Sequence, residues 1–424
     1  MPGSGVRSGR GREVAIATLV GVAVLVVASV LPNVHLLDAH KGGDTAVYQT
    51  YGERIVSGEL PYRDFYVEYP PGALPAFAAP TFGAEHDYPQ HSKYLQWALA
   101  ALTVLLVSIT LVLLGADRRR LITGTVLVGL APVALGYVTY TRYDWWPAAL
   151  TAAALAALVA GRAWTGHAVL GAAVSAKVYP AAMVPLTLAH AWRTRGLRQA
   201  IVAAAWLVGV LAVIVLPFAV VAPGGVGDSL YVQFRRPLQI ESFGATFLHV
   251  AHGLGAYTPH VASGSGSDNF AGSLPNALAT LTSLAELVLL VALYLVFARS
   301  RRTDQQLVDA SVAAVLVYLV LGKVLSPQYL VWIVPLVPLL SGRIRLPAAG
   351  LMLASLVLTQ VYFQFRYHEI VQLERLTWVL VARNLVLLAL LVVVVAGVGV
   401  DLLREARAQP EPVPEPAAPA AERT

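Results

Sequence analysis

The stretch "VAIATLVGVAVLVVASVLP" (Val14–Pro32) decides the fold class of this chain. It is apolar throughout and close to the roughly 20 residues that a helix needs to cross a bilayer. It is too long for the apolar region of a signal peptide, and it lacks a small-residue cleavage site. We therefore expect a retained membrane-spanning helix.

Similar apolar blocks recur along the 424 residues, of which 57% are hydrophobic and only 13% are charged. A soluble domain would carry roughly 25% charged residues. The composition therefore predicts an all-α polytopic membrane protein with about 11–12 transmembrane or re-entrant helices. Further spans are expected near residues 94–115, 121–139, 200–221, 277–298, 308–322, 329–340, 346–363 and 377–400.

The net charge of +6 comes largely from short basic clusters beside these blocks. Such placement is typical of membrane topology, in which basic loops stay in the cytoplasm, and does not indicate nucleic-acid binding. The clusters agree on one orientation, with both termini cytoplasmic. The expected parts are a disordered tail (1–13), a membrane domain (14–400) with two large extracytoplasmic loops (about 33–92 and 222–275), and a Pro-rich disordered tail (401–424).

Several kinds of site are absent from the sequence. There is no cysteine, which excludes disulfides and thiolate metal sites. There is no Walker A motif, no G-x-G-x-x-G between a strand and a helix, and no H-E-x-x-H. We therefore expect no nucleotide, metal or other cofactor.

The first outer loop contains "GGDTAVYQTYGERIVSGELPYRDFYVEYPPG" (Gly42–Gly72), which concentrates charged and aromatic residues. Its first part predicts a surface helix that starts after Asp44, ends at Gly58 and places Tyr48 and Tyr51 on one face. The spacing leaves two roles open for Asp44. Its carboxylate either caps this helix or acts as a base just outside the first membrane span.

The second part of this stretch, "PYRDFYVEYPPG", contains three prolines that prevent a continuous helix. A stiff chain with aromatic rings and carboxylates suits a sugar or a polar lipid headgroup. An aromatic belt at the membrane interface, with local ion pairs, is the alternative. The residues concerned are Arg63, Asp64, Glu68 and Tyr69.

Two lysines, in "AKVYP" and "GKVLSPQY", lie within or at the ends of apolar spans and are followed by proline. A lysine in mid-bilayer costs about 3 kcal/mol, so such residues are usually paired or functional. Lys177 is expected near the turn of a helical hairpin or between two half-helices. A broken helix beside Lys177 or Lys323 suits an anion, while extension of the ammonium to the interface is the alternative.

Two further charged segments lie in outer loops. "FRRPLQIES" (Phe234–Ser242) offers Arg236 for bidentate phosphate contact, or as ordinary loop charge. "TRYDWW" (Thr141–Trp146) contains Arg142 and Asp144, which we expect to pair with each other.

Together, "PYRDFYVEYPPG", "AKVYP", "RRPLQIES" and "GKVLSPQYLVW" resemble motifs of the polytopic glycosyltransferases of family 87. These are actinobacterial mannosyltransferases with the C-type membrane fold, and they use polyprenyl-phosphate-mannose. The resemblance covers the membrane domain from about Val14 to Val400.

The resemblance implies a catalytic carboxylate in the first outer loop, at Asp44, which deprotonates an acceptor hydroxyl. Capping by helix amides is expected to keep this carboxylate ionised. The implied partners are a polyprenyl-phosphate-linked sugar, a glycolipid or lipoglycan acceptor and the lipid bilayer, without nucleic acid. Residue type and position suggest Lys177, Arg236 and Lys323 for the donor phosphate, and Arg63, Asp64, Glu68, Tyr69, Gln239, Glu241, Gln328 and Tyr329 for sugar and acceptor.

The sequence departs from the family pattern in one respect. Many C-type enzymes have two acidic residues close together in the first outer loop. Here the nearest aspartates to Asp44 are Asp38 and Asp64. The sequence therefore leaves open whether a second carboxylate lies in the site.

A secondary transporter or a lipid-linked sugar flippase is the alternative function. Broken helices with buried lysines also fit transporters. Transporters, however, usually contain internal repeats, and none is evident here. Two long, aromatic and acidic outer loops favour the enzyme.

Overall fold

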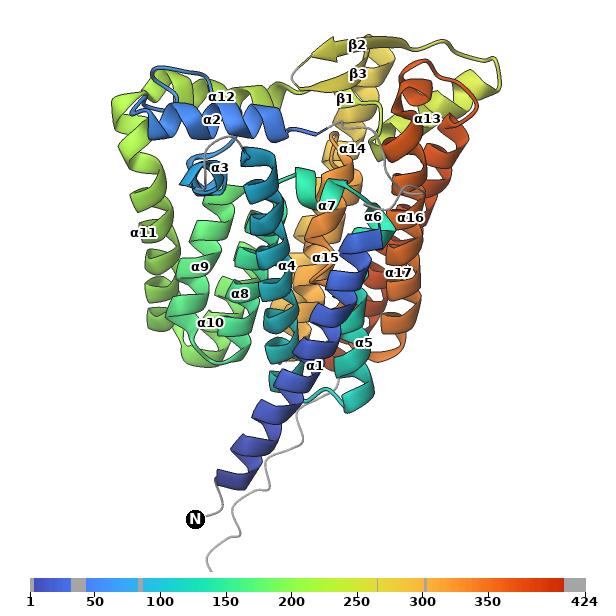
Figure 1. Ribbon diagram of the computed structural model, residues 1–424. Coiled ribbons are helices and arrows are strands. Elements are labelled where there is room, and N and C mark those ends of the chain that lie inside the picture. The colour runs from blue at the N-terminus through green and yellow to red at the C-terminus, as the bar shows by residue number, and fades with distance from the viewer. Residues whose placement is uncertain (1–3, 32–42, 83–86, 265, 301–302, 408–424) are drawn as a thin grey trace, which may run out of the picture.

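The computed structural model describes residues 4–31, 43–82, 87–264, 266–300 and 303–407 (Figure 1). Helices make up most of this part of the chain. The α-helices are α1 (Ser4–Val30), α2 (Thr45–Val56), α3 (Leu74–Ala78), α4 (Tyr88–Leu113), α5 (Arg118–Gly129), α6 (Ala131–Leu135), α7 (Val138–Thr141), α8 (Trp145–Val159), α9 (Ala163–Ala176), α10 (Val184–Arg195), α11 (Leu197–Val221), α12 (Pro223–Arg235), α13 (Phe243–Gly253), α14 (Ser273–Arg299), α15 (Asp304–Leu321), α16 (Arg345–Val371) and α17 (Thr377–Arg407). The 3-10 helices are η2 (Pro71–Ala73), η3 (Ala79–Phe82), η4 (Tyr179–Met183), η5 (Pro327–Trp332), η6 (Val337–Leu339) and η7 (Gly342–Ile344), and the strands are β1 (Leu238–Gln239), β2 (His260–Gly264) and β3 (Ser267–Ala271).

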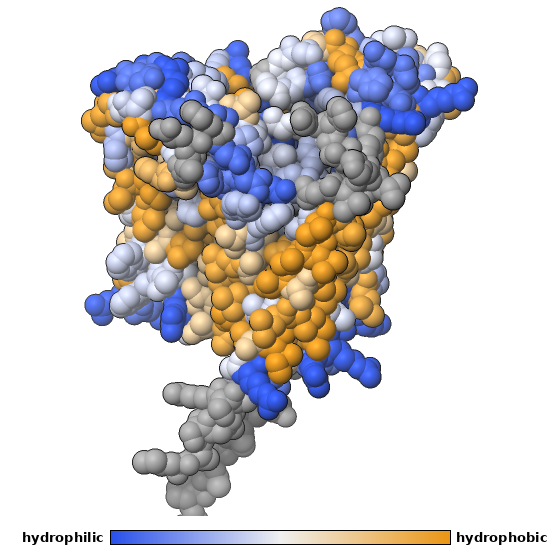
Figure 2. All heavy atoms as spheres, viewed as in Figure 1, coloured by the Kyte–Doolittle hydropathy of each residue, from blue (hydrophilic) through white to orange (hydrophobic). Residues whose placement is uncertain are grey.

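Within the described residues, seven helical segments are long and apolar enough to cross a membrane. On the face shown in Figure 2, apolar residues form a band across the middle of the molecule and polar residues gather at both ends. The expectation of an all-α polytopic membrane protein is therefore confirmed at this level. The segments are Arg10–Val30, Tyr88–Leu113, Leu197–Val221, Ser273–Arg299, Asp304–Leu321, Gly342–Gln364 and Thr377–Arg404.

Two predicted spans are interrupted, which is one reason that fewer long helices are present than the 11–12 expected. The span expected at 121–139 is divided into α5, α6 and α7, because Pro132 cannot donate a hydrogen bond and Gly136 adopts a φ of 73°. The span expected at 329–340 consists of short 3-10 turns, because prolines at 327, 335 and 338 lack the amide hydrogen that an α-helix needs.

The first and last helices are longer than the apolar segments from which they were predicted. The first helix begins at Ser4, within the segment predicted as a disordered tail, and α17 continues to Arg407. Arginine and alanine have high helix propensity, so a membrane helix can continue into water at either end.

One end of the bundle, which we call the loop face, contains α2, α12, α13 and the sheet (Figure 1). As the sequence predicted, α2 follows Asp44, ends before Gly58 and lies across the membrane helices. Its inner face contains Tyr48 and Tyr51, which are buried, whereas Val47 is exposed. The Tyr48 ring stacks on Phe77, with ring centroids 4.7 Å apart. This packing fixes the first outer loop on the bundle.

The second outer loop forms a small antiparallel sheet of order β1-β3-β2. Leu238 pairs with Phe270 across β1 and β3, and both side chains are fully buried. They pack in one apolar cluster with Tyr362 of α16 and Leu380 of α17. The sheet is therefore anchored on two membrane helices.

The basic helix ends lie away from the loop face. α5 starts with Arg118, α10 ends with Arg195, α14 ends with Arg299 and α16 starts with Arg345. The N-terminal end of α1 lies at this same end of the molecule (Figure 1).

The crossing of α9 and α11 gives a stability test. A Cβ atom on Gly171 would lie 2.4 Å from the backbone oxygen of Leu207, whereas a Cβ on Gly209 would meet nothing within 4 Å. We expect Gly171→Ala to separate the two helices and lower stability by about 1–3 kcal/mol. Thermal unfolding of the purified protein measures this effect.

Gly209→Ala is the matched control, because it adds the same methyl group to a helix without a clash. Its effect should be neutral or slightly stabilising, since alanine is the better helix former. Equal melting temperatures for the two variants would contradict the close approach of α9 and α11.

Candidate functional site

A cavity of about 1000 Å³ lies beneath the loop face. Its walls come from both outer loops and from α14, α15, α16 and the segment that follows α15. It brings together Asp44 and the three cations proposed from the sequence, Lys177, Arg236 and Lys323. These four residues are up to 279 positions apart in the sequence, since 323 − 44 = 279.

Asp44 occupies the N-cap position of α2, but its side chain makes no capping hydrogen bond. The expected capping by helix amides is therefore absent. Instead, Oδ2 forms an ion pair with Arg142 and accepts hydrogen bonds from the hydroxyls of Tyr48 at 3.3 Å and Tyr69 at 3.4 Å. Oδ1 has no hydrogen-bonding partner among the described residues, and the side chain is 31% exposed.

Arg142 and Asp144 do not pair with each other, so the sequence-based expectation is wrong. Arg142 pairs with Asp44, whereas Asp144 pairs with Lys177 at 2.6 Å. The backbone is extended at Arg142, with φ −120° and ψ 147°, and turns into the helical region at Asp144, with φ −66° and ψ −17°, so the two residues do not belong to one regular element. Burial lowers the pKa of Arg142 to about 10, so the guanidinium stays charged at neutral pH.

Lys177 follows the last residue of α9, where the helix is interrupted before Pro180. Its ammonium lies 4.6 Å from the ring centroid of Tyr143, 4.9 Å from that of Tyr329 and 5.2 Å from that of Trp332. The Trp332 indole also donates to Asp144 at 2.7 Å. Because aromatic faces attract cations, these rings and Asp144 hold the ammonium inside the protein. The Lys177 ammonium therefore does not extend to the membrane interface, which was the alternative considered from the sequence.

The other two cations differ in their partners. Arg236 donates to Glu68 at 3.0 Å, and this ion pair joins the two outer loops. Lys323 donates to the backbone carbonyl of Phe234 at 2.5 Å and forms no ion pair within the part of the chain that the structure describes. Burial lowers the pKa of Lys323. Of the three candidate cations, Lys323 is therefore the one whose charge is not already balanced by a carboxylate.

Gln239 and Glu241 line the cavity and also connect separate segments. The Gln239 amide donates to Glu241 at 3.1 Å and to Ser326 at 3.1 Å, while its oxygen accepts from the Leu325 amide at 2.7 Å. Glu241 also accepts from the Tyr362 hydroxyl at 2.7 Å. These contacts attach the segment around Lys323 to the second outer loop, so both residues have a structural role.

Gln328 and Tyr329 also line the cavity. The Tyr329 ring stacks on Trp332, with centroids 4.1 Å apart. The Gln328 side-chain oxygen is buried and has no hydrogen-bonding partner among the residues that the structure describes, which leaves one acceptor open in the cavity wall.

Arg63 and Asp64, which the sequence suggested for sugar binding, do not line this cavity. They pair with each other at 2.9 Å, and Asp64 also accepts from the Leu60 amide at 2.8 Å. The hydrogen bond from Arg63 lowers the pKa of Asp64 to about 2. Asp38, the other acidic residue considered near Asp44, lies outside the described residues.

Sequence reasoning missed two acidic residues of the site. Asp144 is 1% exposed and pairs with Lys177, which lines the cavity, although Asp144 itself is not part of the lining. Glu286 lies in the apolar helix α14, lines the cavity and makes no hydrogen bond or ion pair among the described residues. A single carboxylate within a membrane span is a signal of function, and this signal was available in the sequence for Glu286.

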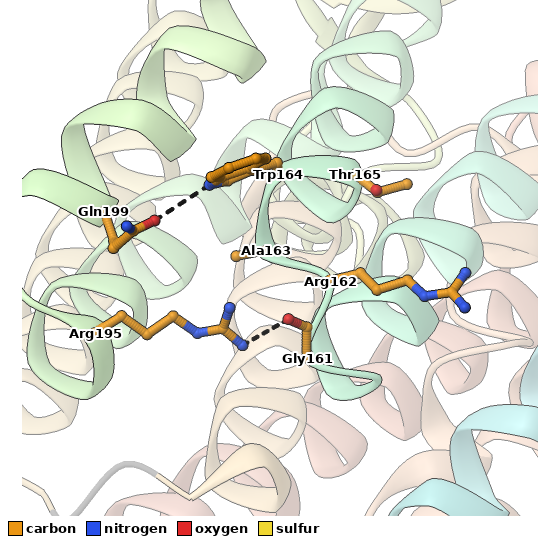
Figure 3. A pocket seen from close by; sticks show the side chains of 7 residues that line it. All are labelled: Gly161, Arg162, Ala163, Trp164, Thr165, Arg195 and Gln199. Carbon is orange, nitrogen blue, oxygen red and sulfur yellow. Dashed lines mark hydrogen bonds between the residues drawn. The ribbon is translucent and has the colours of Figure 1, made fainter.

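A second hollow lies at the turns between α8 and α9 and between α10 and α11 (Figure 3). There Arg195 donates to the Gly161 carbonyl at 2.8 Å and Trp164 donates to Gln199 at 3.2 Å. Its lining contains no carboxylate, so it lacks the acid–base group that the larger cavity has. The larger cavity is the better candidate for chemistry.

Comparison with known protein families and curated sequences does not identify a family for this chain. The chain matches no protein-family model and no curated protein sequence. Among the described residues, no group of three or more His, Cys, Asp or Glu side chains is placed to hold a metal ion.

Removal of the buried counter-charge tests the Asp144–Lys177 pair. We expect Asp144→Asn to destabilise the protein by about 3 kcal/mol, because Lys177 then remains buried without a negative partner. Addition of Lys177→Met should recover part of this loss. Thermal unfolding of the two single variants and the double variant gives the coupling between the residues.

Glu59→Gln is the control for this cycle, because the Arg54–Glu59 pair is partly exposed on both sides. Exposed pairs contribute little to stability, so its melting temperature should barely change. Strictly additive effects of Asp144→Asn and Lys177→Met would contradict a direct ion pair.

Glu241 should make stability depend on pH. Burial raises its pKa from 4.5 to about 7, so the folded protein holds this proton more tightly than the unfolded chain. Its contribution is therefore present below about pH 4.5 and is lost as pH rises towards 7. We expect Glu241→Gln to remove this decrease in melting temperature, and an unchanged pH profile would contradict the assignment.

Proposed function

We propose that this protein is a membrane glycosyltransferase that moves a hexose, with mannose the expected sugar, from a polyprenyl-phosphate donor to an acceptor hydroxyl. One observation carries the proposal. A single cavity contains a carboxylate with an open oxygen and several cations at interrupted helices. The motifs that resemble glycosyltransferase family 87 supply most of these residues.

Asp44 is the proposed general base. Its free Oδ1 can accept the proton of the acceptor hydroxyl, while Arg142 and the two tyrosines hold Oδ2 in place. The acceptor oxygen then forms a bond to the anomeric carbon. The bond from that carbon to the phosphate oxygen breaks, and polyprenyl phosphate leaves with the electron pair. Positioned acid–base catalysis of this kind contributes about 10²–10⁴-fold to a rate.

Fixed cations stabilise the negative charge that develops on the leaving phosphate. Lys323 is the first candidate, because it has no carboxylate partner among the described residues. Lys177 faces the same cavity and retains N–H groups beyond the one that contacts Asp144. Arg236 is paired with Glu68, so its contact with phosphate requires exchange of that partner.

The cavity also has an apolar wall suited to a lipid tail. Leu230 and Phe234 of α12 line it together with Leu287 and Leu290 of α14. Phe234 is 78% exposed and Leu287 is 58% exposed. α14 is long and apolar enough to cross the membrane, and the exposed apolar side chain of Leu287 on it would face lipid, so this wall supports a donor that approaches from the bilayer.

The arrangement of charge supports an extracytoplasmic site. The helix ends with basic residues lie opposite the loop face, and basic ends usually remain in the cytoplasm. On this basis the cavity faces the other side of the membrane, where polyprenyl-phosphate sugars serve as donors in the resembling family.

Transfer should depend on Asp44. We expect Asp44→Asn to slow transfer at least about 100-fold, because the amide cannot accept the acceptor proton. The assay supplies purified protein with radiolabelled polyprenyl-phosphate mannose and octyl α-D-mannopyranoside, and measures the glycosylated product. Binding of the donor should be retained.

Asp228→Asn is the matched control, because Asp228 is exposed on α12 and does not line the cavity. It should transfer sugar like the parent. Full activity of Asp44→Asn would contradict the role of the base. Movement of labelled sugar lipid across vesicles without a glycosidic product would instead favour a transporter or flippase.

A further inference from the structure

One arm of the cavity has a lining that the donor does not explain. It contains Tyr137, Phe363 and Tyr367, with Asp268 and Gln364 beside them. These residues come from the start of α7, from α16 and from β3, and none belongs to the motifs that suggested the function.

The rings form one continuous aromatic surface, which we call the aromatic wall. Tyr137 and Phe363 stack with centroids 6.1 Å apart and an interplanar angle of 20°. Phe363 and Tyr367 pack edge to face at 5.3 Å. Phe363 and Tyr367 are only partly buried, so the wall presents ring surface to the cavity.

The backbone conformation at Gly136 positions the aromatic wall. Gly136 has a φ of 73°, and a Cβ atom there would lie 1.9 Å from the Gln364 side-chain oxygen. Glycine thus permits the chain before α7 to approach α16, which brings Tyr137 onto Phe363. Tyr367 donates to Asp268 at 3.1 Å, so β3 holds the far end of the wall.

The charge of the wall differs from that of the region around the cations. Asp268 is acidic, whereas Lys177 and Lys323 come from the end of α9 and the segment after α15. In Figure 1, α9 lies on the left of the bundle, while α6 and α16 lie on the right. A neutral polyhydroxyl ring suits this arm, since its C–H face packs on aromatic rings and its hydroxyls donate to carboxylate and amide oxygens.

We propose that the aromatic wall, formed by Tyr137, Phe363 and Tyr367, binds a sugar ring of the acceptor. Tyr137 precedes the single turn of α7 and Arg142 follows it, about 8 Å further along the helix axis. Arg142 in turn contacts Asp44. A ring on the wall therefore lies in the same cavity as Asp44. The identification of the bound sugar as the acceptor rests on the proposed function. Binding of a sugar ring to the aromatic wall does not depend on it.

Binding can be tested without transfer. The probe is octyl α-D-mannopyranoside, added to the purified full chain in a detergent without a sugar headgroup and followed by saturation-transfer NMR. We expect the sugar-ring protons to receive saturation from the protein. Phe363→Leu should weaken binding about tenfold, because leucine retains bulk but loses the ring face. Tyr367→Leu serves as a second variant if Phe363→Leu does not fold.

Phe82→Leu is the matched control, because Phe82 is 77% exposed and lies outside the cavity lining. It should bind the probe like the parent. Equal binding by Phe363→Leu, Tyr367→Leu and Phe82→Leu would overturn the proposal, as would absence of ring contacts in the parent.

Two outcomes separate this inference from the proposed function. If Asp44→Asn and the parent both bind the probe through the wall but the parent never forms a glycoside, the transferase proposal fails and the sugar site stands. If the parent forms the glycoside but Phe363→Leu leaves the KM for octyl mannoside unchanged, the transferase stands and the wall is not the acceptor site.

Discussion

The candidate site depends on the buried carboxylate of Asp144. This side chain is 1% exposed, and it joins the ammonium of Lys177 to the indole of Trp332. A buried cation without such a partner is strongly unfavourable. Two residues earlier, Arg142 pairs with Asp44. One short segment between α7 and α8 therefore sets the separation between Asp44, the proposed base, and the ammonium of Lys177.

The interrupted helices explain how an apolar bundle accommodates so many charges. α9 ends before Lys177, α15 ends before Lys323, and the chain between α6 and α8 makes only short turns. Each interruption is near a proline or glycine, and each places polar atoms towards the cavity. The hydrogen bonds of Gln239 and Glu241 then attach the second outer loop to the segment after α15. The cavity is thus a product of broken helices held by the loop face.

The sequence predicted those features that depend on composition or on local signals. Long apolar blocks indicated membrane helices, Asp44 and Gly58 indicated the limits of α2, and the proline after Lys177 indicated the interruption of α9. The tyrosine face of α2 also followed from helical spacing. Each of these signals acts within a few residues, so the surrounding fold does not need to be known.

Long-range pairing could not be predicted in the same way. Arg142 and Asp144 are neighbours of opposite charge, yet their partners are 98 positions away at Asp44 and 33 positions away at Lys177, since 142 − 44 = 98 and 177 − 144 = 33. Arg63 belongs to the same motif as Glu68, yet it faces away from the cavity. Motif density identifies a region of interest but not the direction in which each side chain points.

The contacts of Asp44 also limit the products that the proposed reaction can form. Three donors hold Oδ2, so the carboxylate cannot rotate to exchange its two oxygens without loss of those bonds. Only the lone pairs of Oδ1 are then available to the approaching alcohol, and their direction is fixed. For an acceptor ring held in one orientation, a single hydroxyl lies along that direction. Such an enzyme is regioselective by construction, and it makes one glycosidic linkage from a substrate with several chemically similar alcohols.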